Sequence, residues 1–568
     1  MECARLTLCE SNDPTTCVAL APVGGPYPEP SGDGMQTILV PAAGGSLRFD
    51  ARVDPTRSYD VEVVAYGPAG PDGSSEVVGV GRTSRVRFDG SAATVWLYPT
   101  DGWTCPGNTS TRLRRAFHQS VALSNGDALI LGGIAFEPGA SGLPIAGVSP
   151  TVALVPVAES AFVFDARTEE IVPVRVMGDA RLLQRAFFEA RWIERSAVDG
   201  KERVRLFGGV TGASVAELTL APGRFPVNVR VDGAELAPTV TVLYDATSRT
   251  LEVETPTAMT FETIVETPTD VLPDAEMPRL THTALVGGES SEPQFVTQVA
   301  RVPALMGFGA MLVSTRRGAT LTPVPGGWLV YGGNVADVDP ALAAERVVLI
   351  GATDGRPRSL MVPAEVVPSV LHTASVVDGI VVLAGGLTIS GLGRTSPVAA
   401  SSPGPVLRAV RMTPAGDGLE WVPITGGDPE RERIYHTSTR DERDRVIIVG
   451  GSTREGTSQF HAVSSVYAVD VESLTVRELP SLRTERFGHA AVLLPGGRLL
   501  VTGGLRRGDA TSGESVSSLY MVEQPELLVV RPAGGAVSCG AATTDAGATT
   551  DAADDGGVDA FSTTDAPG

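Results

Sequence analysis

A glycine pair that closes a short apolar run recurs along the chain, and this repeat limits the possible folds more than any other feature. It occurs between residues 112 and 532 at Gly132 and Gly133, Gly208 and Gly209, Gly332 and Gly333, Gly385 and Gly386, Gly450 and Gly451, and Gly503 and Gly504. An apolar run of four or five residues bounded by turn residues predicts a strand that is buried on both faces. The sheet that contains such a strand therefore needs a cover on each side.

A second predicted strand precedes each glycine pair, and it usually begins with an arginine followed by a histidine. Arg115 and His118 show the spacing, and the other histidines at this position are His282, His372, His436 and His489. Turn residues such as Asn125 and Gly126 separate the two strands, which predicts a hairpin. A further hairpin follows, for example at residues 161–165 and 171–174. Each unit is therefore predicted to be a four-stranded antiparallel sheet.

The order of arginine, histidine, buried strand, glycine pair and a following Tyr/Phe-x-x-Asp strand resembles the kelch repeat. Members of that family fold as six- or seven-bladed β-propellers, in which a ring of sheets buries both faces of every sheet. The resemblance covers residues 112–532, although Trp421 alone retains the usual tryptophan and Gly287 follows His282 after only five residues. It implies an all-β, kelch-like propeller of seven blades, because residues 294–314 hold enough apolar sequence for another hairpin. Six blades are the alternative.

The repeated histidines raise the question of a metal site, but their spacing argues for a structural role. Metal ligands must converge within about 2 Å of one ion, whereas equivalent positions on successive blades diverge. We therefore assign the Arg, His and Gly repeat positions to the fold, and we assign no catalytic, cofactor-binding or metal-binding residue. Copper radical oxidases related to galactose oxidase use a kelch-like propeller with a cysteine bonded to a tyrosine. No cysteine lies between Cys105 and Cys539, so no cofactor is expected.

Three other regions flank the repeats. Residues 1–33 form a cysteine-containing segment, and residues 34–105 contain short runs of alternating polar and apolar residues, among them 59–64, 76–80, 85–88 and 94–98. Short strands at regular spacing predict a small antiparallel β-sandwich, immunoglobulin-like or fibronectin-like. Residues 533–568 are rich in Ala, Thr, Asp and Gly. Such a segment has little apolar surface to bury, so an acidic disordered tail is expected.

The cysteines lie at the borders of these regions, at Cys3, Cys9, Cys17, Cys105 and Cys539. Cysteines placed in this way are typical of disulfides, which persist in oxidising compartments. We therefore expect an exported protein located outside the cell, in the periplasm or on the outer cell surface. The odd number leaves one thiol free, paired with another chain or lipidated. Cys3 is the candidate for a lipid anchor, and a local disulfide is the alternative.

The charge balance excludes some partners. The formal net charge of −21 opposes binding to nucleic acid and to anionic lipid headgroups. The sequence also lacks an uninterrupted apolar stretch of about 18 to 20 residues, so no transmembrane helix is expected. Lys201 is the single lysine among 45 basic residues, which is typical of a bacterial genome of high GC content. The acidic pair Glu169 and Glu170 lies in a predicted hairpin turn and is interpreted as solvated.

Three long segments after glycine pairs, at residues 134–159, 211–238 and 387–405, are predicted to be adaptable loops on one face of the propeller. Loops of that kind commonly bind ligands. We therefore expect a noncatalytic recognition protein of the bacterial cell surface whose ligand is a protein or a glycan. A carbohydrate-active or oxidase-type enzyme and a structural envelope component are the alternatives. The oligomeric state is left open.

Overall fold

The computed structural model describes residues 3–10, 18–19, 54–106, 113–136, 142–144, 154–207, 210–254, 280–299, 316–335, 347–388, 407–426 and 433–530, with gaps inside several of these ranges. Their regular structure is almost entirely β-strand, and the 3₁₀ turns η2 (Ala180–Leu183) and η5 (Ala510–Ser512) are short exceptions. The prediction of an all-β chain is confirmed. No helix in these residues is long and apolar enough to cross a membrane.

The N-terminal part forms one antiparallel sheet with the strand order β2-β1-β3-β4-β5. Its strands are β1 (Cys3–Glu10), β2 (Val18–Ala19), β3 (Tyr59–Ala69), β4 (Ser75–Val86) and β5 (Leu97–Pro99). We call it the N-terminal sheet. Strand β1 pairs with β3 along its whole length, so the sheet includes part of the predicted segment 1–33. The run 76–80 and the first two residues of the run 85–88 belong to the single strand β4, because pairing with β3 continues through shifts in register up to Val86. Residues 36–50 lie outside the described residues.

Six sheets follow from the repeated units, and we number them as repeat sheets 1 to 6. Sheet 1 contains β7 (Gln119–Ala122), β8 (Ala128–Leu131), β12 (Ala161–Asp165) and β13 (Glu170–Pro173). Sheet 2 contains β15 (Glu189–Arg195), β16 (Glu202–Phe207), β21 (Val240–Asp245) and β22 (Thr250–Val253), with β14 (Arg175–Met177) parallel to β22. Sheet 3 contains β26 (Thr320–Val324), β27 (Gly327–Tyr331), β29 (Val347–Gly351) and β30 (Pro357–Ser359).

The remaining three have the same arrangement. Sheet 4 contains β31 (Ser369–Val377), β32 (Ile380–Thr388), β33 (Leu407–Met412) and β34 (Leu419–Val422). Sheet 5 contains β37 (Thr437–Arg440), β38 (Arg445–Val449), β41 (Val466–Asp470) and β42 (Thr475–Leu479), with β35 (Thr425–Gly426) parallel to β42. Sheet 6 contains β43 (Ala490–Leu494), β44 (Arg498–Thr502), β47 (Glu526–Val529) and β6 (Trp103–Thr104).

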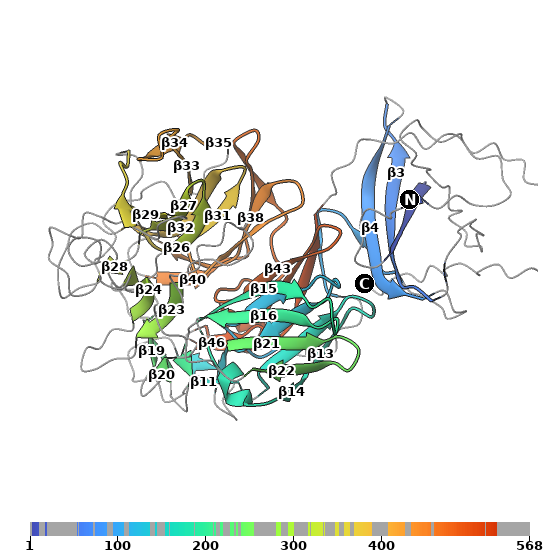
Figure 1. Ribbon diagram of the computed structural model, residues 1–568, viewed down its shortest axis with the longest axis horizontal. Helices are drawn as coiled ribbons and strands as arrows, with labels where there is room; N and C mark the ends of the chain where they lie inside the picture. The colour runs from blue at the N-terminus through green and yellow to red at the C-terminus, as the bar shows by residue number, and fades with distance from the viewer. Residues whose placement is uncertain are drawn as a thin grey trace, which may run out of the picture.

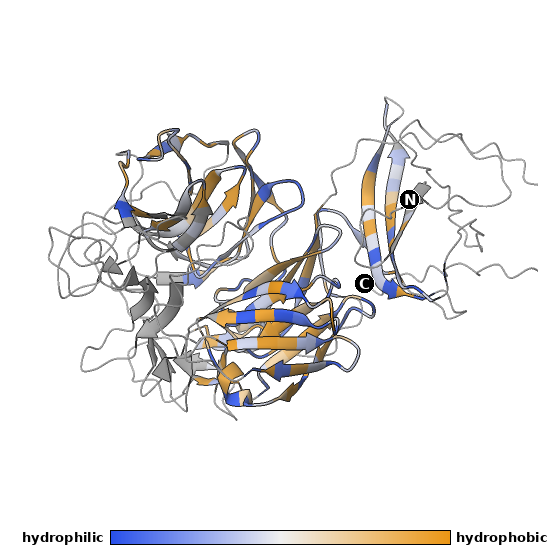
Figure 2. Cartoon of the chain, in the orientation of Figure 1, coloured by the Kyte–Doolittle hydropathy of each residue, from blue (hydrophilic) through white to orange (hydrophobic). Residues whose placement is uncertain are grey.

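Alternate side chains of a repeat sheet enter two different apolar clusters. In sheet 1, Leu129 and Val163 pack against sheet 2, whereas Ile130 and Phe162 pack against sheet 6. Further clusters join sheet 6 to sheet 5, sheet 5 to sheet 4, and sheet 4 to sheet 3. The sheets therefore pack face to face in the order 2, 1, 6, 5, 4, 3, and Figure 1 shows this succession from β16 through β43 to β38, β31 and β27. Orange, apolar residues recur along the strands of the repeat sheets in Figure 2.

A further sheet lies at one end of this succession. It contains β23 (Leu280–Leu285), β24 (Gln294–Val299), β25 (Arg316–Arg317) and β28 (Asn334–Val335). We call it the β23 sheet. Strand β23 lies beside β16 of repeat sheet 2, and β25 directly precedes β26 of repeat sheet 3 in the chain. The β23 sheet thus contacts repeat sheet 2 and is connected by the chain to repeat sheet 3, the two sheets at the ends of the packing order.

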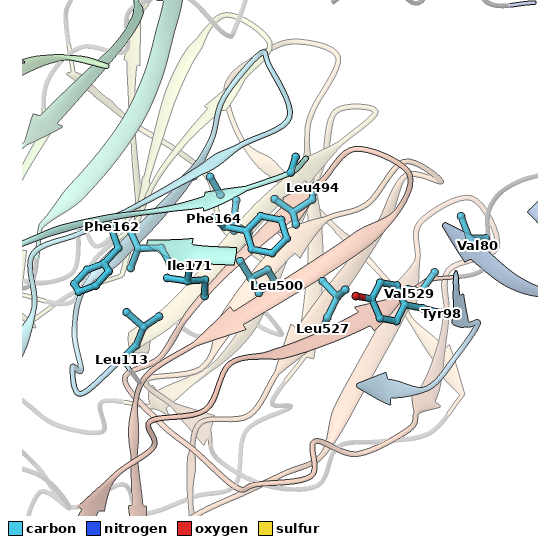
Figure 3. Packing of buried hydrophobic residues seen from close by; sticks show 14 of the residues in the cluster. Val80, Tyr98, Leu113, Phe162, Phe164, Ile171, Leu494, Leu500, Leu527 and Val529 are labelled. Carbon is cyan, nitrogen blue, oxygen red and sulfur yellow. The ribbon is translucent and has the colours of Figure 1, made fainter. Parts of the chain in front are cut away.

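The N-terminal sheet shares its core with repeat sheets 1 and 6. One apolar cluster combines Val80 and Tyr98 of the N-terminal sheet with Phe164 of sheet 1 and with Leu494 and Leu527 of sheet 6. Figure 3 shows these side chains together. Burying one large apolar side chain contributes about 1.5–3 kcal/mol to stability. The N-terminal sheet is therefore packed against the repeat region.

The last repeat sheet contains one strand from the N-terminal side of the repeats. Strand β6 pairs with β47 so that Trp103 lies opposite Leu528. The Trp103 side chain is buried in the cluster between sheets 5 and 6, and its indole N–H donates to the Pro480 carbonyl at 2.6 Å. Segments from the two ends of the repeat region are consequently hydrogen-bonded within one sheet.

Candidate functional site

The repeated arginines fix the start of the units in which they lie. Each of three buried guanidinium groups donates Nη1–H to the carbonyl of the first glycine in its own glycine pair. The nitrogen–oxygen distances are 2.9 Å for Arg115 and Gly132, 3.0 Å for Arg433 and Gly450, and 3.2 Å for Arg486 and Gly503. Burial lowers the pKa of Arg115 to about 10. In these three units, the arginine is thus hydrogen-bonded to the glycine pair at one end of the strands.

The repeated histidines join neighbouring sheets. In each described case the Nε2 atom is hydrogen-bonded to a threonine hydroxyl of the next sheet in the packing order. The pairs are His118 with Thr502, His372 with Thr320 and His436 with Thr373, all at 2.8 Å, and His489 with Thr437 at 3.0 Å. The side chain of His282, whose backbone lies in β23, is outside the described residues. The described repeat histidines therefore contribute bonds between sheets.

In three of the glycine pairs, both glycines make close contacts that a side chain would block. A Cβ atom on Gly503, whose φ is +60°, would lie 2.3 Å from the Arg115 carbonyl oxygen of the neighbouring sheet. A Cβ atom on Gly504 would meet the Phe487 carbonyl oxygen of its own unit at 2.9 Å. The first glycines Gly132, Gly332, Gly385 and Gly450 and the second glycines Gly133 and Gly451 make equivalent contacts. Gly386 lies in β32, and Gly208, Gly209 and Gly333 lie outside the described residues.

Burial keeps the four repeat histidines with described side chains neutral over most of the pH range. It lowers the pKa of His372 and of His436 to about 3, and it lowers those of His118 and His489 well below their usual value. Nearby arginines add to this effect. Neutral imidazole has both a donor and an acceptor nitrogen, so it can exchange a hydrogen bond with a threonine hydroxyl.

The histidines should make the protein less stable in acid. The pKa of His436 is lower in the folded than in the unfolded chain, so the unfolded chain binds the extra proton below about pH 6.5. The free energy of unfolding should therefore fall by about 1.4 kcal/mol per pH unit for such a histidine as the pH drops toward 3. Urea unfolding at several pH values measures this slope. His436→Gln should make it shallower by about that amount, and an unchanged slope would contradict the assignment.

The turns that contain the repeat arginines precede the first strand of a hairpin, and the glycine pairs follow its second strand. Because the two strands are antiparallel, both features lie at the same end of the hairpin. We call this side of the molecule the diglycine face. The opposite side carries the hairpin turns, such as Asn125–Gly126 and Gly496–Gly497, and we call it the turn face. Short strands follow the glycine pairs on the diglycine face. They include β9 (Ile134–Phe136), β17 (Val210–Thr211), β39 (Ser452–Glu455) and β45 (Leu505–Arg507).

These short strands form a second layer that connects different units. Strand β9 pairs with β11 (Leu154–Pro156), which pairs with β18 (Ala216–Thr219), and β18 pairs with β19 (Asn228–Val231). Strand β10 (Leu143–Pro144) pairs with β46 (Ser518–Met521), and β46 pairs with β45. Two more groups are β36 (Arg433–Ile434), β39 and β40 (Gln459–Ala462), and β17 with β20 (Glu235–Leu236).

This layer differs from the adaptable loops expected at residues 134–159 and 211–238. Their described parts are paired strands, and the β11–β18 and β10–β46 pairs each join segments of two units. Pairing between units satisfies backbone groups that a lone loop would leave to water. Within residues 387–405, Leu387 and Thr388 end β32, and the others lie outside the described residues. His461, the one histidine outside the repeat position, is half-buried on β40.

An aromatic cluster on the diglycine face was not predicted from the sequence. Phe117 and Tyr435, each directly before a repeat histidine, have φ angles of +54° and +53°, and Gly488 at the same position has +63°. The Phe117 amide donates to the Gly488 carbonyl at 2.7 Å, and the Gly488 amide donates to the Tyr435 carbonyl at 2.9 Å. The Phe117 and Tyr435 rings meet edge to face at 5.4 Å. The sequence shows which residue precedes each repeat histidine. It does not show that this residue has a left-handed backbone, which is what brings the two rings together.

The segment after Gly504 is a folded hairpin with charged and aromatic side chains. Arg506 forms two hydrogen bonds with the Glu514 carboxylate, at 2.6 and 2.7 Å, and its guanidinium lies over the Tyr520 ring at 5.6 Å. Asp509 caps η5 by accepting from the Thr511 amide at 2.8 Å. The hairpin therefore has a defined shape on the diglycine face.

The acidic pair expected to be solvated is divided between two environments. Glu169 is buried, accepts from Arg498 at 2.8 Å and accepts a hydrogen bond from the Tyr98 hydroxyl. The expectation was wrong for this residue, because its turn packs against sheet 6 and the N-terminal sheet. Glu170 is only half-buried, on β13.

The candidate cysteines are only partly described. Cys105 is a half-buried free thiol whose sulfur accepts from Gln524 Nε2 at 3.1 Å. Cys3 and Cys9 lie on β1, but their side chains, together with Cys17 and Cys539, lie outside the described residues. No group of three or more His, Cys, Asp or Glu side chains suited to a metal ion occurs among the residues that the structure describes.

No protein-family model matches the chain, and no curated protein matches it at a significant level.

Proposed function

We propose that the repeat sheets and the β23 sheet form a closed, kelch-like β-propeller of seven blades. The face-to-face order of sheets 2, 1, 6, 5, 4 and 3 supports this, and the β23 sheet beside β16 supplies the remaining blade. The His118–Thr502 bond repeats, between sheets 1 and 6, the bond that links successive units elsewhere. The pairing of β6 with β47 provides the link between the two ends of the repeat region.

We further propose that this ring is a noncatalytic recognition module of an exported bacterial protein, which binds a protein or a glycan on its diglycine face. One observation carries the proposal: on that face, short strands from different units pair into a second layer outside the repeat sheets. Such a layer holds side chains of several units in fixed relative positions. Fixed side chains lose less conformational entropy when a ligand binds.

The turn face is less accessible for the same purpose. The N-terminal sheet packs there against sheets 1 and 6, and Gly126 and Gly496 lie next to Ser84 and Arg82 of β4. The last described residue, Val530, also lies on this side, because its amide donates to the Gly497 carbonyl at 2.9 Å. The N-terminal sheet and the C-terminal end of the described repeat region therefore both lie on the turn face. If Cys3 carries a lipid, the diglycine face would be directed away from the anchor.

Arrays of glycans and of surface proteins, probed with the full chain, test whether the protein recognises such ligands. We expect at least one ligand, and adding it should slow amide hydrogen exchange in β9, β39 and β45. The turn at residues 197–200, where Val198 is 98% exposed, serves as the matched control and should not change. An absence of ligands on the arrays, or protection confined to the turn face, would count against the proposal.

A further inference from the structure

The seam between repeat sheets 1 and 6 differs from the other seams, because the two sheets come from opposite ends of the repeat region. The chain runs from β6 of sheet 6 into β7 of sheet 1, whereas β43, β44 and β47 of sheet 6 come from the other end of the repeat region. The contacts across this seam include the apolar cluster, the His118–Thr502 bond, the β10–β46 strand pair, the bond from the Phe117 amide to the Gly488 carbonyl, and the pair between Glu169 of sheet 1 and Arg498 of sheet 6. The two ends of the repeat region meet at this seam, so contacts that hold both sheets together bear directly on closure of the ring.

The N-terminal sheet contacts both sides of that seam. On sheet 1, Arg85 of β4 donates Nη1–H to Asp127 at 2.8 Å, and its Nη2 reaches Asp127 at 2.8 Å and Asp165 at 2.7 Å. The Tyr98 hydroxyl of β5 also donates to the carboxylate of Glu169 on sheet 1, and this carboxylate accepts from Arg498 of sheet 6. The Asp101 amide, which follows β5, donates to the Val529 carbonyl of sheet 6 at 2.8 Å. The side chains of Val80 and Tyr98 enter the cluster shared by sheets 1 and 6.

The backbone at Arg85 supports a specific role for this contact. Its φ angle is +58°, a left-handed conformation that side chains other than glycine, asparagine and aspartate rarely adopt. Such a conformation persists when surrounding contacts determine it. Here the Arg85 amide donates to Asp60 Oδ1 at 3.1 Å, and the guanidinium reaches the two carboxylates. The strained backbone therefore directs the arginine onto sheet 1.

We propose that the N-terminal sheet is a clamp that keeps the ring closed at the seam between repeat sheets 1 and 6. Arg85 attaches the clamp to sheet 1, while Tyr98 and the shared apolar cluster attach it to both sheets. The chain continues from β5 directly into β6, the strand that completes sheet 6. Docking of the N-terminal sheet and completion of the ring are therefore coupled. This inference rests on the proposed closed ring.

Hydrogen exchange of the full chain, read by mass spectrometry, tests the clamp. Alanine keeps a Cβ atom, and so keeps the backbone strain, while it removes the guanidinium. In Arg85→Ala we expect amides of β8, β12, β44 and β47 to exchange at least tenfold faster, with little change in β32 and β38. Arg85→Lys should give an intermediate result. Arg411→Ala is the control, because its pair with Glu420 lies on the exposed surface of sheet 4.

The pH dependence separates this role from a general contribution to stability. Burial raises the pKa of Asp127 to about 6, although Arg85 opposes the increase. Asp165, Arg249 and Tyr244 are the other ionisable groups near this carboxyl. Without Arg85, Asp127 is buried with an uncompensated charge at pH 8 but can be protonated at pH 5. The acceleration of exchange in Arg85→Ala should therefore be larger at pH 8 than at pH 5, after correction for intrinsic exchange.

The possible results distinguish a failure of the clamp proposal from a failure of the proposed closed ring. Uniform acceleration in all repeat sheets, or no acceleration in Arg85→Ala, would overturn the clamp. Rapid exchange of β7 and β43 in the wild-type chain would show that the ring is not closed, and would overturn the proposed architecture as well.

Discussion

Arg498→Met is expected to lower the free energy of unfolding by about 3–5 kcal/mol. The Arg498 and Glu169 side chains are 0% and 1% exposed, and their nitrogen–oxygen distance is 2.8 Å. Methionine fills part of the arginine's volume but leaves the carboxylate of Glu169 buried without its cation. The cost of an uncompensated buried charge exceeds the loss of an ordinary contact. Denaturant unfolding at pH 7 measures the difference.

A second substitution shows whether charge is the cause. Glu169→Gln combined with Arg498→Met removes the unpaired charge and keeps an oxygen that can accept from Tyr98. The double variant should therefore be more stable than Arg498→Met alone, and a double-mutant cycle gives the coupling between the two residues. Additive losses would contradict a role for the ion pair, and would indicate that packing around Arg498 determines the effect.

Gly503→Ala is expected to cost about 3 kcal/mol or more, from two sources. A left-handed backbone costs an alanine about 1–2 kcal/mol. The new Cβ atom would also lie 2.3 Å from the Arg115 carbonyl oxygen and 2.7 Å from His118 Cε1, and overpacking of this kind typically costs about 1–3 kcal/mol. Sheets 1 and 6 would have to move apart. Thermal and denaturant unfolding should both show the loss.

Gly416→Ala is the matched control for that substitution. Gly416 has a φ of +71°, close to the +60° of Gly503, but no atom lies within 4 Å of its ideal Cβ position. Its replacement should therefore cost only the backbone term of about 1–2 kcal/mol. Equal losses for the two variants would mean that the close contact between sheets has no energetic role.

The local structure of the repeats could be predicted from the sequence because it depends on residues that are near one another in the chain. The apolar run before Gly132 predicted a strand buried on both faces, and β8 is buried along its whole length. The turn at Asn125 and Gly126 predicted the hairpin of β7 and β8, which pair in antiparallel register. Both predictions require only alternation, burial and turn geometry.

The contacts between units could not be predicted in this way. The threonine bound by His118 lies 384 residues away, and no local pattern identifies it. Glu169 occupies a hairpin turn, where a carboxylate is normally exposed, and only the arrangement of sheet 6 and the N-terminal sheet makes it buried. Arg85 lies on an alternating strand, and its sequence does not reveal a left-handed backbone. Tertiary packing determines all three.

The strand β6 has a consequence for how the chain reaches its folded state. Trp103 is hydrogen-bonded to Pro480, 377 residues further along, and it lies opposite Leu528. Contacts of such long sequence separation form slowly, because the entropy of closing the intervening loop is lost before they contribute. During synthesis the early strand has no partner until nearly the whole polypeptide has left the ribosome. Completion of sheet 6 is therefore a late kinetic step, and a nascent chain that stops early leaves Trp103 exposed to chaperones and proteases.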